Sequence, residues 1–314
     1  MHLMKIKETL HERNKHRSGY DLDHLVKAVP GLKAYIKETP TGKKSLDWAD
    51  PDAVFLLNKA ILLSYYKLDN WSIPKGFLCP PVPGRADYIH YLADLLASVN
   101  EDKIPQGKSI RVLDLGVGAN CIFPIIGVAE YGWKFVGADI NSAALKSAKG
   151  IAAFNKSLQK NVEIRLQKDE GSFLHNIIRP NDFFDALVCN PPFYKDQEEA
   201  NKHAMRKLNN LGRRSGQSKV LNFGGEKHEL IAEKGELGFV SGLIEESAQF
   251  PTRVFWYTTL VSSGKYLSQL YKLLKDKKVY DYQTIEMKQG NKSSRILAWT
   301  FLRPKEQKKW NFGS

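Results

Sequence analysis

Long apolar runs are scarce in this chain. The longest nearly apolar run covers residues 121–129 and contains Pro124 and Gly127, whereas a membrane-spanning helix needs roughly 20 apolar residues. Residues 1–10 alternate charged with apolar side chains and lack the hydrophobic segment of a signal peptide. The sequence therefore predicts a protein without a membrane helix that stays in the cytoplasm.

Cysteine is equally scarce. Cys79, Cys121 and Cys189 are widely separated, and no two of them have the spacing of a zinc site or a redox pair. We expect a reducing compartment and no metal, and we expect Cys121 and Cys189 to be small core residues rather than nucleophiles.

Acidic residues are fewer than basic ones. The 314-residue chain has 47 Lys plus Arg against 34 Asp plus Glu, which gives a net charge of +13, and 42% of its residues are hydrophobic. Such a chain is long enough to fold as an enzyme-sized protein. A positive surplus attracts polyanions, so nucleic acid is the leading partner, although the same charge is explained equally by solubility alone.

Apolar residues recur at helical spacing over residues 22–29, 52–66 and 86–99. Residues 1–105 are thus predicted to form a helical N-terminal accessory region.

From residue 109 onward, short apolar strands alternate with helix-like stretches, as in parallel sheets covered by helices on both faces. Strands are expected at residues 110–115, 134–139, 162–167, 184–190, 253–262, 279–287 and 295–302. The last two are separated by a turn around Gln289-Gly290-Asn291 and should pair as an antiparallel hairpin. The pattern predicts an α/β domain over residues 106–303, with a seven-stranded, mostly parallel sheet and a terminal antiparallel hairpin. A basic tail, residues 304–314, follows and is expected to fray over residues 305–309.

The first chemical motif is a strand that ends in Asp114-x-Gly116-x-Gly118 and leads into a helix near Ile122. Glycines allow a sharp turn at the carboxyl end of the strand, where open α/β sheets bind ligands. Cys121 stands where a dinucleotide-binding motif has its third glycine, which disfavours a pyrophosphate. Asp114 instead indicates a cofactor with a cationic amine.

The second motif is Asp139, at the end of the predicted strand 134–139. Its carboxylate can accept hydrogen bonds from the ribose hydroxyls of an adenosyl group. Alone, it could equally cap the helix that starts at Ser142. The neighbouring glycine loop favours the ribose contact.

The third motif, Asn190-Pro191-Pro192-Phe193, directly follows an apolar strand. Prolines fix the backbone and lack N–H donors, so carbonyl oxygens point into the crevice. The Asn190 side-chain oxygen and the Pro191 carbonyl can accept both N–H groups of an amine on a purine ring, and Phe193 can stack on the base. A structural Pro-Pro turn is the alternative, which the position after the fourth strand disfavours.

These motifs resemble the class I (Rossmann-like) methyltransferases that use S-adenosylmethionine and act on planar amines, namely adenine N6, guanine N2 and glutamine side chains. More specifically, the chain resembles the ribosomal RNA large subunit methyltransferase F family from about residue 11 to 302, and is similar to eukaryotic enzymes that methylate adenine N6 in snRNA. The segments that carry the resemblance are residues 11–16, 45–48, 50–54, 83–90, 224–225, 235–240 and 297–301.

The resemblance implies methylation at N6 of one adenine of 23S rRNA, adenine 1618, on rRNA or on a large-subunit assembly intermediate. It also implies that Arg85 binds the methionine carboxylate of the cofactor and that Asp169 or Ser172 makes a further cofactor contact. For Arg85, a surface position opening a helix is the alternative. A guanine-N2 rRNA methyltransferase, a glutamine methyltransferase and an RNA-binding module without catalysis stay open as other functions.

Basic and polar residues beside the base pocket are candidates for RNA binding. One group lies near the N-terminus and the other in a long basic loop, residues 194–234, whose stretch 201–219 has no acidic residue. The candidates are Arg13, Asn14, Lys15, His16, Arg206, Lys207, Arg213 and Arg214. For any single one of them, a solvated surface position is the favoured alternative.

Overall fold

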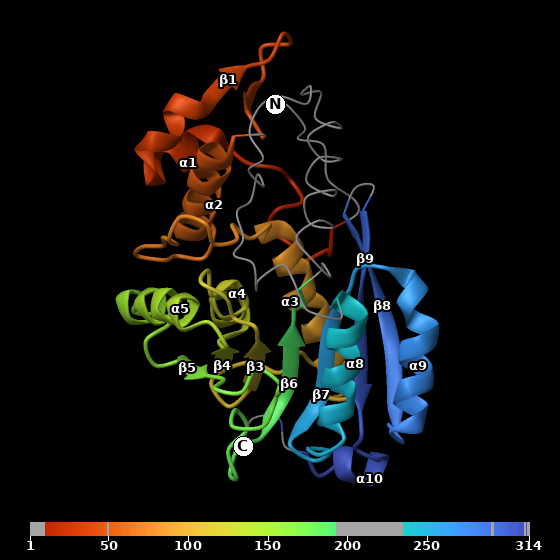
Figure 1. Ribbon diagram of the computed structural model, residues 1–314. Helices are drawn as coiled ribbons and strands as arrows, with labels where there is room; N and C mark the ends of the chain where they lie inside the picture. Colours follow the sequence, from red (N-terminus) through yellow and green to blue (C-terminus); the bar gives the residue numbers. More distant parts are fainter. Residues whose placement is uncertain (1–9, 49, 193–234, 290–291, 311, 313–314) are drawn as a thin grey trace.

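The computed structural model describes residues 10–48, 50–192, 235–289, 292–310 and 312. Its centre is a seven-stranded sheet with the order β5-β4-β3-β6-β7-β9-β8 (Figure 1). The strands are β3 Arg111–Leu115, β4 Lys134–Asp139, β5 Val162–Leu166, β6 Phe184–Cys189, β7 Val254–Val261, β8 Asp281–Gln289 and β9 Lys292–Thr300. Strands β3 to β7 pair in parallel, and β9 is antiparallel to both β7 and β8. The predicted α/β fold with a terminal hairpin is confirmed.

The two middle strands β6 and β7 are buried along their whole length. A parallel strand covered on both faces has no solvent side, so its sequence is a nearly continuous apolar run rather than an alternation. In β6 this run is Phe184–Cys189, interrupted by Asp185. The largest shift in a predicted strand start is at β9, which begins at Lys292 rather than at residue 295 because its pairing with β8 extends to Lys292 opposite Gln289.

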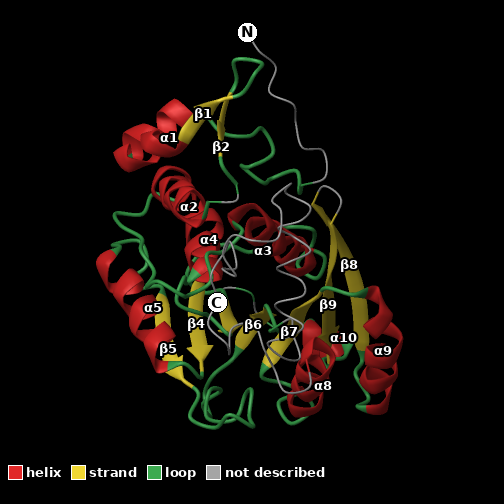
Figure 2. Ribbon diagram, turned by 45° about the horizontal axis from the view of Figure 1, so that its top comes forward, coloured by secondary structure: helices red, strands yellow, loops and turns green. Residues whose placement is uncertain are grey.

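Helices cover both faces of the sheet (Figure 2). On one face lie α3 Val82–Ala97, α4 Ile122–Tyr131 and α5 Ser142–Phe154, and on the other α8 Gly235–Ser247 and α9 Leu267–Asp276. Neighbouring residues of β3 alternate between the two cores, with Val112 in the first and Leu113 in the second. This alternation follows from the period of two in a β-strand.

The N-terminal region lies beyond the carboxyl ends of the parallel strands (Figure 1). It contains α1 Leu22–Ala28, the 3-10 helix η1 Pro30–Tyr35, the hairpin β1 Ile36–Glu38 with β2 Lys44–Leu46, and α2 Pro51–Tyr65. The three helices expected from periodicity are α1, α2 and α3; the short hairpin was not expected. Asp21 and Asp50 cap α1 and α2 by accepting from backbone N–H groups. Buried residues of α1, α2 and α3 belong to the same apolar core as one face of the sheet.

The C-terminal segment is anchored to the amino end of the sheet. It forms the short helix α10 Pro304–Gln307, and the Trp310 Nε1 donates to Asp185 Oδ1 at 2.8 Å. Phe312 and Trp310 both pack on the Phe255 ring, with centroid distances of 5.1 and 5.5 Å. The expectation that residues 305–309 fray is therefore corrected, because an aromatic anchor directly after them holds the segment. No helix in the described part of the chain is long and apolar enough to cross a membrane.

Candidate active site

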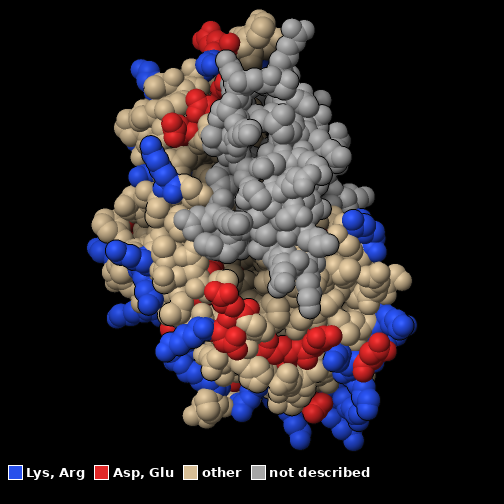
Figure 3. All heavy atoms as spheres, in the orientation of Figure 1, with Lys and Arg blue, Asp and Glu red and all other residues tan. Residues whose placement is uncertain are grey.

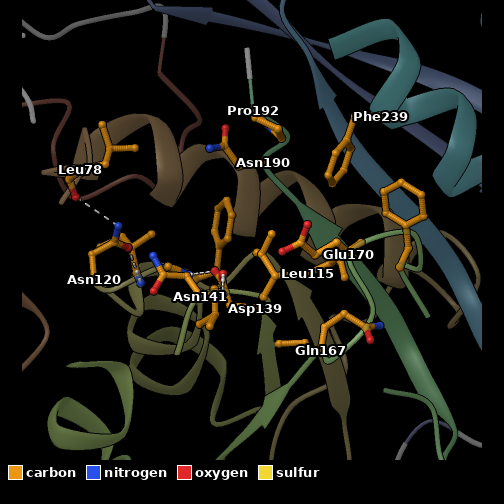
Figure 4. A pocket seen from close by; sticks show the side chains of 18 of the residues that line it. Leu78, Leu115, Asn120, Asp139, Asn141, Gln167, Glu170, Asn190, Pro192 and Phe239 are labelled. Carbon is orange, nitrogen blue, oxygen red and sulfur yellow. Dashed lines mark hydrogen bonds between the residues drawn. The ribbon is translucent and has the colours of Figure 1, made fainter. Parts of the chain in front are cut away.

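A cavity of about 1010 Å³ opens at the carboxyl ends of β3, β4 and β6 (Figure 4). In that view Asn190 and Pro192 lie on one side of the cavity and Asp139 and Asn141 on the other. Seven residues that were predicted for catalysis or cofactor binding line it: Arg85, Gly116, Gly118, Asp139, Ser172, Asn190 and Pro192. Asp114, Asp169 and Pro191 adjoin the lining residues in the chain, and Phe193 lies outside the described residues.

The glycine loop forms the floor between β3 and α4. Gly116 and Gly118 have φ values of +82° and +62°, a region that residues with a Cβ rarely adopt. A Cβ at Gly116 would project into open space, so the need for glycine here comes from the backbone turn and from the cavity above it. As expected, α4 begins at Ile122.

Asp114 lies buried beneath this loop, and neither of its carboxylate oxygens has a hydrogen-bond partner among the described residues. Burial, together with the nearby charge of Asp139, raises the pKa of Asp114 well above its usual range, while Arg85 acts in the opposite direction. A buried carboxylate without a partner is unfavourable. The site thus fits a ligand that brings a positive charge to Asp114.

Arg85 stands in the first turns of α3 and reaches the cavity. It is 9% exposed, and burial lowers the pKa of its guanidinium to about 10, so it stays charged at neutral pH. Its guanidinium carbon lies 5.7 Å from the centroid of the Phe123 ring. A cation at Arg85 and a carboxylate at Asp114 together match the zwitterionic end of an amino acid, as S-adenosylmethionine has.

Asp139 is the last residue of β4 and lies on the opposite wall of the cavity. Its Oδ2 accepts from the Gly118 N–H at 3.0 Å and its Oδ1 from the Asn141 N–H at 2.9 Å. The cap of α5 is Asn141, whose side chain accepts from the N–H groups of Ala143 and Ala144. Helix capping therefore does not account for Asp139, and a carboxylate can accept up to about four hydrogen bonds. Its place on the cavity wall suits ribose hydroxyls.

The loop after β5 supplies the third wall. Ser172 lines the cavity, whereas Asp169 is exposed and accepts from the Ser172 hydroxyl at 2.7 Å and from the Gly171 N–H at 2.9 Å. Of the two residues expected to contact the cofactor, Ser172 is the one on the wall, and Asp169 orients it. Glu170, which was not predicted, also lines the cavity.

A buried carboxylate from α8 holds this loop in place. Glu246 accepts the backbone N–H groups of Phe173, Leu174 and His175 at 2.7, 2.8 and 2.7 Å. Glu246 lies about seventy positions later in the sequence, so no local pattern marks it. A glutamate three positions after the apolar Leu243, at helical spacing, is the only signal that the sequence offers.

Asn190 follows β6 directly, and its Oδ1 is buried without a hydrogen-bond partner among the described residues. The end of β6, immediately before Asn190, is fixed by Tyr88, whose hydroxyl accepts a hydrogen bond from the Cys189 N–H at 3.3 Å. An amide oxygen that lines a cavity without a partner is a ready acceptor for an N–H group of a ligand.

Two of the N-terminal RNA-binding predictions are corrected. The side chain of Asn14 is buried and donates to the Pro83 carbonyl at 2.9 Å and to Asp87, and His16 is fully buried with its Nε2 2.8 Å from the Tyr66 hydroxyl. These side chains fasten the segment to the protein interior and do not face a ligand.

Arg13 and Lys15 also tie this segment to the helices. Arg13 pairs with Asp94 on α3, and Lys15 pairs with Glu130 on α4 at 2.8 Å. Their side chains stay 30% and 41% exposed, so they remain candidates for RNA contacts. Arg206, Lys207, Arg213 and Arg214 lie outside the described residues.

The three cysteines are buried, and burial raises the pKa of each thiol, that of Cys79 to about 11. They are core residues rather than thiolate nucleophiles. Within the described ranges, no group of three or more His, Cys, Asp or Glu side chains is placed to hold a metal ion.

Comparison with known proteins gives a consistent result. A family model described as RNA methyltransferase matches residues 4–303. Proteins named ribosomal RNA large subunit methyltransferase F are similar: that of Photobacterium profundum is 47% identical, covering 97% of this chain and 95% of the relative, and that of Flavobacterium johnsoniae is 48% identical, covering 98% of each.

Solved structures show the same fold. The catalytic domain of human METTL16 in complex with MAT2A 3′UTR hairpin 1 has a TM-score of 0.79 and 29% identity over 95% of this chain and 97% of that one. The N-terminal domain of human METTL16 in complex with SAH has a TM-score of 0.74 and 26% identity over 94% and 99%.

Proposed function

The chain belongs to this RNA methyltransferase family, and we propose that it transfers the methyl group of S-adenosylmethionine to N6 of one adenine in 23S rRNA, adenine 1618. The observation that carries the proposal is Asn190 Oδ1, a buried acceptor without a partner among the described residues, on a residue that follows β6 and lines the cavity. The large-subunit rRNA assignment rests on the names of the relatives.

The residues of the cavity fit this cofactor. Asp114 would accept hydrogen bonds from its amino group, Arg85 would donate to its carboxylate, and Asp139 would accept from its ribose hydroxyls. When bound, the cofactor supplies an electrophilic methyl group on a sulfonium. Loop 171–173 and Phe239 on α8 line the same cavity and offer backbone and aromatic surface for the adenosyl ring.

The amine to be methylated is a weak nucleophile, because its lone pair is delocalised into the purine ring. Asn190 Oδ1 and the Pro191 carbonyl accept its two N–H groups and direct the lone pair toward the methyl group. This arrangement needs hydrogen-bond acceptors at fixed positions rather than a strong base. Phe193, directly after them, is proposed to stack on the target base.

RNA contacts outside the base pocket are proposed at Arg13 and Lys15, and at Arg206, Lys207, Arg213 and Arg214. Arg13 lies beside α3, the helix that carries Arg85, and Lys15 pairs with Glu130 on α4. The partner is 23S rRNA, either free or in an assembly intermediate of the large subunit. Charged side chains beside a base pocket hold the phosphates of looped RNA.

The test is methylation of unmodified large-subunit rRNA with radiolabelled S-adenosylmethionine, followed by nucleoside digestion and chromatography. Label in N6-methyladenosine, lost when adenine 1618 is replaced by guanine, is expected. Label in N2-methylguanosine would replace the proposal by a guanine methyltransferase. Label only in added ribosomal protein would indicate a glutamine methyltransferase, and cofactor binding without any turnover would indicate a binding module.

A further inference from the structure

A second groove, of about 640 Å³, lies beside the active site. One wall is the segment between α2 and α3, residues 70–77, and the other is the outer side of α5. The two cavities share a partition, because Asn141 and Ser142 line the active site while Ala143 and Ser147 line the groove. Buried Phe77, Ala119 and Ala144 pack together inside this partition.

The surface of the groove is largely apolar and includes one exposed ring. Phe154, at the end of α5, is 61% exposed, the largest exposed fraction of any large hydrophobic side chain in the described part of the chain. Ile73 and Ile151 lie in the same groove. A contiguous apolar surface rimmed by polar side chains often marks a binding groove.

The two segments that form the groove carry positive charge and no negative charge. Neither residues 70–77 nor α5 contains an acidic residue. Lys146 lines the groove. Four more lysines belong to the chain segments that form or follow its walls: Lys75, Lys149, Lys156 and Lys160. None of the five makes an ion pair with a described residue. The nearest acidic residue in the chain, Asp69, accepts the Lys156 backbone N–H. Figure 3 shows basic side chains along the left edge of the molecule, where Figure 1 places α5.

We propose that this groove binds one unpaired nucleotide of the RNA substrate, outside the methylation site. Its base stacks on Phe154, and its phosphates lie at Lys146 and Lys149. An aromatic platform beside unpaired cations is the arrangement by which proteins hold single-stranded nucleic acid without reading its sequence. The inference rests on the proposed RNA substrate and extends it: RNA in the active site continues across the amino end of α5 into the groove.

The first experiment locates RNA on the wild-type protein. A large-subunit rRNA transcript that contains 4-thiouridine is bound to the full chain, irradiated and digested, and crosslinked peptides are identified by mass spectrometry. Adducts within residues 70–77 or 143–154 are expected. Adducts confined to other segments, under conditions in which the transcript is methylated, would overturn nucleotide binding in the groove and leave the proposed function intact.

The second experiment measures the affinity for the same transcript. Phe154→Ala should weaken it about tenfold, as for the loss of one stacked base, whereas Tyr280→Ala removes a ring that is 48% exposed on β8's side of the sheet and should not. Lys146→Glu with Lys149→Glu should also flatten the salt dependence of binding. The control is Lys272→Glu with Lys275→Glu on α9, on the opposite face.

The cofactor affinity of each variant, measured separately, confirms that it folds. Equal effects of the groove and control variants on RNA affinity would refute the proposal that the groove binds RNA. A wild-type protein that binds and methylates no RNA would instead refute the proposed function itself. A normal RNA affinity in both groove variants, combined with capture of an acidic peptide, would assign the groove to a protein partner.

Discussion

Tyr88 and Thr258 share a hydrogen bond of 2.8 Å beneath the carboxyl end of β6. The Thr258 hydroxyl gives its one hydrogen to the Leu187 carbonyl at 2.6 Å, so the Tyr88 hydroxyl must donate to Thr258 and accept the Cys189 N–H at 3.3 Å. The two hydroxyls thus form a directional chain that fixes the backbone immediately before Asn190. Tyr88 is fully buried, and burial raises the pKa of its hydroxyl, so the hydrogen stays in place.

Tyr88→Phe should lower kcat about tenfold and leave the cofactor Kd unchanged. It removes the acceptor of the Cys189 N–H, so the strand end shifts, and a small displacement of a positioning group is costly for the rate. Steady-state kinetics and cofactor titration separate the two effects. Tyr91→Phe on the same helix is the matched control, and an equal loss in both variants would mean that only stability had changed.

Asn190→Ala should cost about 3 kcal/mol of transition-state stabilisation, roughly a hundredfold in kcat. The variant loses one of the two acceptors of the amine while Asp114, Arg85 and Asp139 stay in place. Cofactor affinity should therefore be near normal. Turnover close to that of the wild type would exclude the amine clamp as the basis of catalysis.

Cofactor binding should release protons and strengthen as the pH rises through the pKa of Asp114. That pKa is raised in the free protein, whereas the cationic amine of the cofactor favours the ionised carboxylate, so binding drives the proton off. The expected gain is up to about tenfold in affinity per pH unit at pH values below that pKa. Calorimetry in buffers with different ionisation enthalpies measures the release.

Asp114→Asn is the control for this pH dependence. It should bind the cofactor more weakly, and its affinity should be nearly constant over the same pH range. A proton release that persists in this variant would assign the titration to another group.

Glu246→Gln should raise the cofactor Kd severalfold with little change in kcat at saturation. A glutamine keeps one acceptor oxygen but turns an NH₂ group toward the remaining N–H groups of residues 173–175, and one unsatisfied buried group costs about 1–3 kcal/mol. Thermal denaturation and cofactor titration test this. Glu245→Gln, exposed on the same helix, should match the wild type; a kcat loss without a Kd change would contradict the assignment.

The protein should lose stability as the pH falls below about 6.5, in part through His90. Burial, followed by the charges of His11 and Arg13, lowers the pKa of His90 from 6.5 to about 3. In this pH range the unfolded chain therefore binds a proton at His90 that the folded protein does not bind. This lowers the free energy of unfolding by about 1 kcal/mol for each pH unit.

Denaturant unfolding of His90→Gln at several pH values tests this dependence. The substitution should flatten the pH dependence, with exposed His24→Gln as control. An unchanged slope in His90→Gln would assign the acid sensitivity to other groups.

The sheet was largely predictable because β3, β4 and β6 are apolar runs that end in chemically distinctive residues. The same property made the site predictable. Asp114 and Asp139 lie at or next to the last residue of their strands and Asn190 directly follows one, and the carboxyl ends of parallel strands meet at one edge of the sheet. The order of the strands along the chain was therefore enough to predict that these residues lie close together. The cavity lies at this edge of the sheet.

The residues that sequence analysis missed or misplaced depend on partners far away in the chain. Asn14 and His16 resemble exposed polar residues until Asp87 and Tyr66 are found beside them. Glu246 likewise accepts a hydrogen bond from a distant segment, the loop after β5, through the Leu174 N–H. A pattern in one segment carries no information about a buried hydrogen bond to another, so such side chains are assigned to the surface by default.

The position of β9 between β7 and β8 has a consequence for biosynthesis. Strand β7 is buried along all eight of its residues, and its outer edge pairs only with β9, residues 292–300. Until the end of the chain leaves the ribosome, this apolar edge has no partner, and unpaired apolar edges recruit other strands. Chains that are truncated before residue 292 should therefore aggregate, even though every residue of the active site has already been synthesised.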